Sequence, residues 1–121
     1  MRLHNATSIG KRAEDIAEKF LRSCGMKIRA RNFRYGRVGE IDIIADDGDV
    51  LVFIEVKARS SSLYGSPESA VTATKQRVLR HVAAGYLHIC EIEHRECRFD
   101  VVAIRWNGGV PHITHIKHAF A

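Results

Sequence analysis

The chain has 121 residues, of which 45% are hydrophobic and 27% charged, with a net charge of +5. This length suits a single domain spanning residues 1–121, and no apolar run reaches the roughly 18 residues that a membrane span needs. The start lacks the apolar core of a signal peptide, and three cysteines do not make a disulfide framework, so we expect a cytoplasmic protein without a membrane partner. The excess positive charge favours nucleic acid as the partner, with an ordinary basic surface as the alternative.

The first third of the chain predicts a helix and then a strand. Apolar residues recur at helical spacing from Ser8 to Cys24. Thr7 or Ser8 can cap the start of this helix, and Gly25 suits its end. Residues 26–33, "MKIRARNF", alternate apolar and basic side chains. This alternation predicts a strand with one apolar and one basic face.

The middle of the chain predicts a β-hairpin. Residues 34–39 contain two glycines and indicate a turn. The β-rich runs "EIDIIA" (40–45) and "VLVFIEVKA" (50–58) follow, joined by "DDGD". Such a polar turn between two apolar runs is typical of two antiparallel strands.

The last part of the chain predicts a second helix and one more strand. A polar loop at 61–67 precedes a helix that Ser66, Pro67 and Glu68 would open and that would run to about Leu87. Residues 97–106 predict a strand, and "NGG" leads into a short tail, residues 110–121. The order helix, three strands, helix, strand predicts one α/β domain with a mixed central sheet flanked by helices.

The stretch "FIEVK" carries two charges inside an otherwise apolar strand. Glu55 and Lys57 lie two residues apart and so share one face. Burying charges in a central strand is costly unless they are paired or bind a ligand. If the hairpin pairs its strands, Asp42 comes close to Glu55, and two carboxylates suit the oxygen shell of Mg²⁺. The alternative is a solvent-exposed hairpin face with an ordinary salt bridge.

These residues resemble a known family. "GEIDIIADDGDVLVFIEVKARSSSLYGSPESAV", with "RNFR" before it, and "RFDVVAI" and "HAF" after it, is similar to the YraN-type predicted endonucleases of the PD-(D/E)XK superfamily. The resemblance covers nearly the whole chain and implies a restriction-endonuclease-like αβββαβ core. It also implies that Asp42 and Glu55 are the acids of the motif and that Lys57 is its lysine.

A third acid is expected on the first helix. In related nucleases such an acid completes the metal site, and the glycine that usually precedes it is Ala13 here, followed by Glu14. On a helical wheel Glu14 flanks the apolar stripe and can reach the sheet, whereas Asp15 faces solvent. Glu14 is therefore the expected third ligand and Glu40 a lesser candidate, with a plain surface role for Glu14 as the alternative.

Basic side chains close to the acids predict where nucleic acid would bind. Arginines grip phosphates, and aromatic rings such as those of Phe33 and Tyr35 stack on bases. Lys75, inside the second helix's apolar stripe, either snorkels to solvent or reaches the acidic site. The predicted contacts are Arg29, Arg31, Arg34, Arg37, Lys75, Gln76 and Arg80. A solvated basic face is the alternative explanation.

Two further sets of residues carry metal-binding atoms. His88, Cys90, His94 and Cys97 are zinc-ligand types, but their spacing fits no common zinc pattern. His112, His115 and His118 recur at every third residue, which we interpret as side chains of a tail. Zinc or a histidine-bound metal remains the lesser alternative in each case.

The sequence thus predicts an endonuclease that hydrolyses phosphodiester bonds in DNA, including branched or junction DNA, with Mg²⁺ as cofactor and Mn²⁺ as its substitute. Lys57 would position the attacking water. Symmetric cutting of a junction would need two such sites and hence a homodimer. The alternatives are a non-catalytic nucleic-acid-binding module on a nuclease fold and a basic scaffold for another protein.

Overall fold

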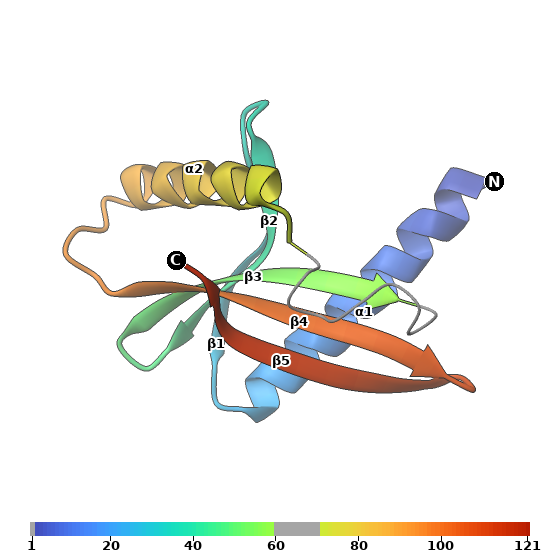
Figure 1. Cartoon of the computed structure of the whole chain (residues 1–121). Coiled ribbons are helices and arrows are strands. Elements are labelled where there is room, and N and C mark those ends of the chain that lie inside the picture. Colours follow the sequence, from blue (N-terminus) through green and yellow to red (C-terminus); the bar gives the residue numbers. More distant parts are fainter. Residues whose placement is uncertain (1, 60–70) are drawn as a thin grey trace.

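The computed structural model describes residues 2–59 and 71–121 of the chain, which form two helices and five strands (Figure 1). In chain order these are α1 (Arg2–Ser23), β1 (Lys27–Tyr35), β2 (Gly39–Asp47), β3 (Val50–Arg59), α2 (Ala73–Ile89), β4 (Cys97–Asn107) and β5 (Val110–Phe120). The strands form one sheet in the order β1-β2-β3-β4-β5. The β3–β4 pair is parallel and the other neighbours are antiparallel. The predicted restriction-endonuclease-like αβββαβ core with a mixed sheet is confirmed.

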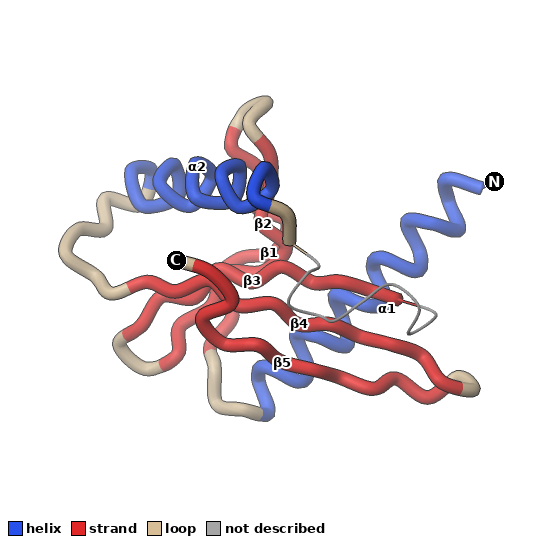
Figure 2. Tube along the Cα trace, in the orientation of Figure 1, coloured by secondary structure: helices blue, strands red, loops and turns tan. Residues whose placement is uncertain are grey.

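The central strand is apolar on both faces because a helix covers each of them (Figure 2). On one face, α1 packs Ala17 and Leu21 into a core with Val52 and Ile54 of β3. On the other face, α2 joins a core around Phe53 of β3. Alternate residues of one strand thus enter two separate cores, which explains the continuous apolar run in the sequence. No helix among the described residues is long and apolar enough to cross a membrane.

Two helix starts differ from the sequence prediction. The helix α1 begins at Arg2, well before the predicted caps Thr7 and Ser8. The N-cap of α2 is Thr72, whose side chain accepts a hydrogen bond from the backbone N–H of Lys75 (3.1 Å). The predicted opening at Ser66, Pro67 and Glu68 lies outside the described residues.

The interpretation of residues 110–121 as a tail is wrong, because they form strand β5 at an edge of the sheet. The reason is the burial of β4, whose outer side needs a hydrogen-bonding partner strand. A network of charged side chains between β4 and β5 holds β5 in place. Asp100 is fully buried and accepts hydrogen bonds from Arg98 Nε (3.0 Å) and the backbone N–H of His118 (3.2 Å). His115 Nε2 lies 2.7 Å from the same carboxylate.

The Asp100 network keeps a buried charge paired. Burial alone raises the pKa of Asp100, but the hydrogen bonds from His115 and Arg98 outweigh it and hold that pKa below its usual value. Arg98 also contacts Asp47 of β2 (Nη2–Oδ2, 2.8 Å). His115 is therefore a structural side chain of the sheet, whereas His112 is exposed.

The alternation of side chains between the two faces of β1 is interrupted twice. The prediction of one apolar and one basic face on this strand is therefore wrong. The register with β2 shifts at Arg29, between Ile28 and Ala30. Asn32 then has a positive φ of 52°, a conformation that asparagine tolerates better than most residues. As a result Arg29 reaches Tyr86 of α2, whereas Arg31 bonds to α1 on the opposite face.

Two glycines let this hairpin lie directly against α2. A Cβ on Gly39 would stand 2.6 Å from Val78 Cγ1, and one on Gly85 would stand 2.5 Å from the ring of Tyr35. Both distances are shorter than carbon atoms tolerate, so only glycine fits at either position. The close approach holds the end of the hairpin nearest Asp42 in a fixed place on α2.

We expect Gly85→Ala to destabilise the protein by roughly 1–3 kcal/mol in urea unfolding, because the added methyl group overpacks the contact with Tyr35. The matched control is Gly10→Ala in α1, where a Cβ meets nothing within 4 Å. Alanine there should be neutral or stabilise by up to about 1 kcal/mol, since it lowers the entropy of the unfolded chain. Equal effects of the two substitutions would contradict the docking contact.

Candidate active site

Asp42 and Glu55 meet where the β2–β3 ladder ends. The last residue pair of the ladder on this side is Ile43 with Ile54. At the next position the side chain of Asp42 replaces a backbone partner, and its Oδ2 accepts a hydrogen bond from the N–H of Val56 (2.8 Å). The two strands therefore separate here around a carboxylate instead of continuing their pairing.

Glu55 lies at the centre of a charged group on the α2 side of the sheet. Its side chain is only 7% exposed, and its Oε2 lies 3.5 Å from Lys57 Nζ and 3.8 Å from Lys75 Nζ. Lys57 comes from the same strand, whereas Lys75 comes from the first turn of α2. Of the two roles weighed for Lys75, the structure shows the one in which it reaches the acidic site.

The two carboxyl groups repel each other enough to alter the protonation of one of them. Burial, and then the charge of Glu55, raise the pKa of Asp42 to about 7, although the hydrogen bond from Val56 lowers it. At neutral pH the pair therefore holds a proton part of the time. A divalent cation can take the place of this proton, and carboxylate oxygens are the ligands that Mg²⁺ prefers. The donor set thus fits such an ion.

Glu14 lies beside this pair but is held by other partners. Its Oε1 accepts hydrogen bonds from Arg31 Nη2 and Asn32 Nδ2, both at 3.1 Å. Its charge is still close enough to raise the pKa of Asp42 further. Within residues 2–59 and 71–121, no three His, Cys, Asp or Glu side chains are arranged to hold a metal ion. The structure therefore brings together two of the three predicted ligands, and Glu14 would have to leave Arg31 to join them.

The predicted zinc and lesser acidic candidates are not brought together either. The three cysteines, at positions 24, 90 and 97, are free thiols. His88 and Cys90 are exposed at the end of α2, and no metal-binding group forms there among the described residues. Glu40 is paired with Arg34 across the β1–β2 ladder, without an ion pair to any described residue.

Two of the predicted nucleic-acid contacts are occupied by internal partners. Arg31 forms ion pairs with three acids of α1, namely Glu14, Asp15 and Glu18. The hydrogen bond to Asp15 is the main reason that the pKa of Arg31 lies above its usual value. Arg29 donates to Tyr86 Oη (2.9 Å) and lies 3.4 Å from Asp46. Both guanidinium groups therefore have their charge balanced inside the protein.

Apart from Lys75, the other predicted contacts form no ion pair with an acid among the described residues. The helix α2 contains no Asp or Glu. Arg80 donates to the carbonyl of Ala121 (3.2 Å), and Gln76 donates to that of Val71 (3.1 Å). Arg34 and Arg37, on the hairpin that packs against α2, have no ion-pair partner in the described part of the chain. Sequence reasoning missed Arg77, which is exposed on the same helix and whose one hydrogen bond within the described residues is to Thr74 Oγ1 (3.3 Å).

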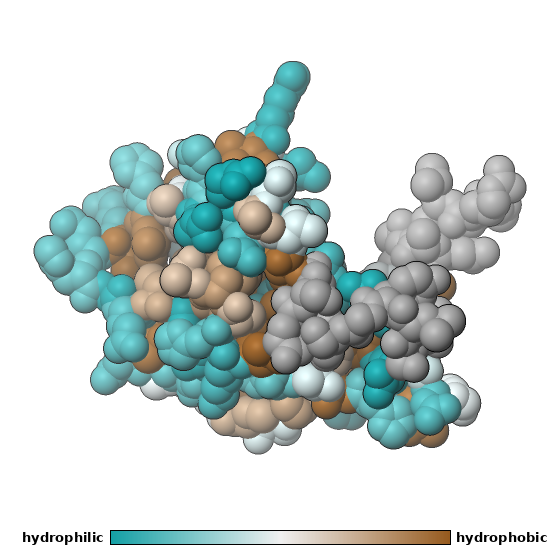
Figure 3. Space-filling view, in the orientation of Figure 1, coloured by the Kyte–Doolittle hydropathy of each residue, from teal (hydrophilic) through white to brown (hydrophobic). Residues whose placement is uncertain are grey.

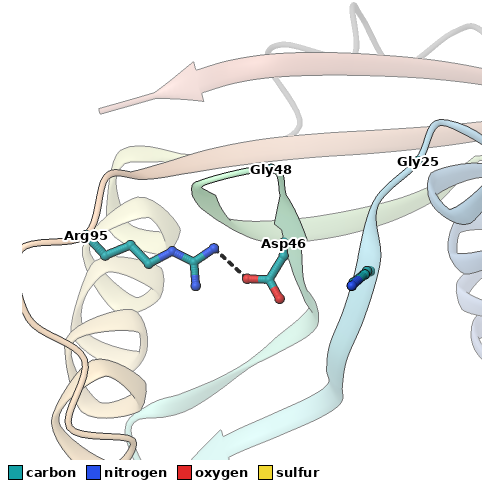
Figure 4. A pocket seen from close by; sticks show the side chains of 5 residues that line it. Gly25, Asp46, Gly48 and Arg95 are labelled. Atoms are coloured by element: carbon teal, nitrogen blue, oxygen red, sulfur yellow. Dashed lines mark hydrogen bonds and ion pairs between the residues drawn. The ribbon is translucent and has the colours of Figure 1, made fainter.

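A pocket of about 420 Å³ lies at the opposite end of the sheet, beside the turn that joins β2 and β3 (Figure 4). It is lined by Gly25, Lys27, Asp46, Gly48 and Arg95. Arg95 crosses it to form an ion pair with Asp46, as the dashed line shows. Because Glu55 and Lys57 lie in the other half of β3, this pocket is separate from the acidic pair.

The chain matches the model of a family described as "Uncharacterised protein family UPF0102" over residues 13–104. The chain belongs to the UPF0102 family. A UPF0102 protein of Rhodococcus jostii strain RHA1 is 46% identical over 118 residues, covering 97% of this chain and 98% of the relative. One from Geobacter metallireducens is 45% identical over 120 residues, covering 99% and 97%. One from Symbiobacterium thermophilum is 51% identical over 96 residues, covering 79% and 80%.

These matches confirm the YraN-type family that the sequence resembled. The family description and the names of the relatives state no activity. The chemistry of this UPF0102 chain therefore has to be argued from its own residues.

The raised pKa of Asp42 predicts a stability change with pH. The folded protein binds this proton more tightly than the unfolded chain, whose Asp42 has an ordinary value of 3.8. The contribution is thus fully present below about pH 4 and is lost as the pH rises through about 7. At about 1.36 kcal/mol per pKa unit, we expect wild type to lose roughly 2–4 kcal/mol relative to Asp42→Asn between pH 4 and pH 8.

Urea unfolding of both proteins across this pH range measures the difference, because the other titrating groups are shared. In the same experiment Mn²⁺ should stabilise wild type more at pH 8 than at pH 5, and should stabilise Asp42→Asn less at either pH. Parallel pH curves for the two proteins would contradict the buried pair.

Proposed function

We propose that this chain is a Mg²⁺-dependent endonuclease that hydrolyses phosphodiester bonds in DNA. The observation that carries the proposal is the meeting of Asp42 and Glu55 at the end of the β2–β3 ladder, with Lys57 and Lys75 at their edge. A buried and a half-buried acid that repel each other are costly to keep for stability alone. Their arrangement is supported as a cation site by the chemistry of its oxygen donors.

Each residue has a role that follows from its position. Asp42 and Glu55 would hold the cation, which when bound supplies a Lewis acid for the phosphate oxygens. The ammonium group of Lys57 would orient the attacking water and stabilise the negative charge that develops on phosphorus. Lys75, on the adjacent helix, would bind a non-bridging oxygen of the phosphate.

The acidic pair favours an enzyme over a simple binding module. A carboxylate that faces a phosphate repels it, so a protein that only grips DNA gains nothing from buried acids. The lysines offset only part of this repulsion, since both lie 3.5 Å or more from the same oxygen of Glu55. A bound cation would remove the repulsion between the carboxylates and a phosphate. The site would therefore suit a phosphate only when it holds a cation.

The DNA would lie across α2 and the β1–β2 hairpin. The positive charges of Arg34, Arg37, Arg77 and Arg80 are not balanced by acids among the described residues, unlike those of Arg29 and Arg31. Arg80 and Arg77 lie on the helix that begins beside Lys75. The unbalanced charge therefore leads directly to the acidic pair.

We expect Lys57→Ala and Asp42→Asn to abolish cleavage in a screen of linear, single-stranded, flapped and four-way DNA with Mg²⁺ or Mn²⁺. Their DNA affinity in metal-free buffer should stay within about threefold, since one cation among many adds little to binding. Lys117→Ala, on the edge strand β5, is the matched control and should cut normally. Cleavage that survives undiminished in Lys57→Ala would refute the catalytic role, and no cleavage of any DNA by wild type would favour the binding module.

The salt dependence of DNA binding tests the proposed surface. Arg37→Ala and Arg80→Ala should each flatten the log–log slope of affinity against salt by about 0.9 per lost phosphate contact. Arg31→Ala should leave the slope almost unchanged and lower the melting temperature, because its partners are the acids of α1. A slope that changes only in Arg31→Ala would place the DNA on the α1 side of the sheet.

A further inference from the structure

The tip of the β1–β2 hairpin, residues 35–39, projects beyond α2 and away from the body of the protein (Figure 1). The turn is closed by a hydrogen bond from Val38 N–H to the carbonyl of Tyr35 (3.0 Å), with Gly36 at a φ of 53°. Val38 is 40% exposed, and its neighbour Arg37 is exposed and has no partner in the described part of the chain. In Figure 3 a hydrophilic side chain projects from this end of the molecule, with hydrophobic surface at its base.

The tip has a fixed position relative to the acidic pair. Val38 directly precedes Gly39, whose backbone lies against Val78 of α2. On the other arm of the hairpin, Tyr35 packs on Gly85. From Val38 to Asp42 the chain spans four residues, or at most about 13 Å at about 3.3 Å per residue. An aliphatic side chain is thus held near the site, exposed to solvent and next to an unpaired arginine.

We propose that Val38 is a wedge that enters DNA at an unstacked base step, while Arg37 and Arg34 bind the flanking phosphates. Inserting an apolar side chain between two bases requires free energy to unstack them, and this free energy is smallest where the stacking is already broken. The favoured substrate is therefore DNA with a branch or a boundary between duplex and single strand. This inference rests on the proposed endonuclease function.

The distance between Val38 and Asp42 also predicts where the DNA would be cut. A span of at most about 13 Å corresponds to no more than about four base steps at about 3.4 Å each. Cleavage is therefore expected within about four nucleotides of the branch.

A protein partner fits the tip less well than DNA. A specific protein interface buries about 800 Å² on each side and has an apolar centre. The tip offers one valine beside glycines and arginines, which is too small an apolar surface for such an interface. Its positive charge instead complements phosphate.

The experiment compares a four-way DNA junction with a linear duplex of the same sequence, each with 2-aminopurine at the branch position, in metal-free buffer. Wild type is expected to prefer the junction at least fivefold and to raise the fluorescence of the unstacked base. Val38→Thr keeps the side-chain shape but adds a hydroxyl group. It should remove the fluorescence rise and reduce the preference to within twofold, with unchanged affinity for the linear duplex. Val38→Asp, which also repels phosphate, should likewise remove the fluorescence rise and the preference, and should weaken binding of the linear duplex only through that added charge.

The matched control is Val110→Thr, because Val110 is a 56% exposed valine that follows the turn between β4 and β5. This variant should keep both the preference and the fluorescence rise. If Val38→Thr and Val38→Asp keep them too, the wedge is wrong. A junction of RNA bound more tightly than the DNA junction would overturn the choice of DNA.

The same proteins separate this inference from the proposed function. A wild type that unstacks the branch but cuts nothing with Mg²⁺ would remove the endonuclease and leave the wedge. A wild type that cuts linear and branched DNA equally, without a fluorescence rise, would remove the wedge and leave the endonuclease.

Discussion

The structure depends on one electrostatic constraint, the meeting of the half-buried Asp42 with the buried Glu55 at the end of the β2–β3 ladder. Asp42 can be accommodated there because it accepts the N–H of Val56, which would otherwise lack a backbone partner. Glu55 can be accommodated because Lys57 and Lys75 lie within 4 Å of it. Loss of solvation, and then the remaining repulsion from Glu55, raise the pKa of Asp42. A carboxyl group whose pKa is raised by partial burial and a like charge is typical of a functional site.

The surrounding fold can be understood as support for this pair. The change of face at Asn32 carries the hairpin from the α1 side of the sheet to the α2 side. The glycines at positions 39 and 85 then let the hairpin lie against α2. The same helix supplies Lys75, so α2 contacts both the hairpin and the acidic pair. On the opposite face, Arg31 draws three acids of α1 together and keeps Glu14 beside Asp42.

The positively charged side chains fall into two groups, those paired with acids and those without an acidic partner among the described residues. Arg29, Arg31 and Arg98 are paired with acids and stabilise the contacts between strands and helices. The cations on α2 and at the hairpin tip have no acidic partner among the described residues, apart from Lys75 at the site itself. These cations contribute to the net charge of +5, and the helix that carries most of them begins beside Glu55. The basic face that the sequence of β1 predicts would instead have placed these charges evenly along one strand.

The sequence by itself determined the order of the elements from α1 to β4 and the residues of the acidic pair. Periodicity is local, so it shows α1, β2, β3 and α2, and the apolar run around Glu55 already marks the strand as central. The spacing of Arg98 and Asp100 carries the same signal as that of Glu55 and Lys57, namely two charges on one face of an apolar strand. That signal could have shown that β4 needs a partner at Asp100 and that residues 110–121 are a strand.

Only the tertiary structure decided which charges are available. Whether Arg31 or Arg37 can bind phosphate depends on the acids that lie near it, and these come from elements far away in the sequence. The same holds for the contact of Lys75 with Glu55 and for the retention of Glu14 by Arg31 and Asn32. The pattern of apolar and polar residues along one strand shows which side chains are buried, because successive side chains point to opposite faces of the strand. Pairing between charges requires the distance between two elements, which no single segment contains.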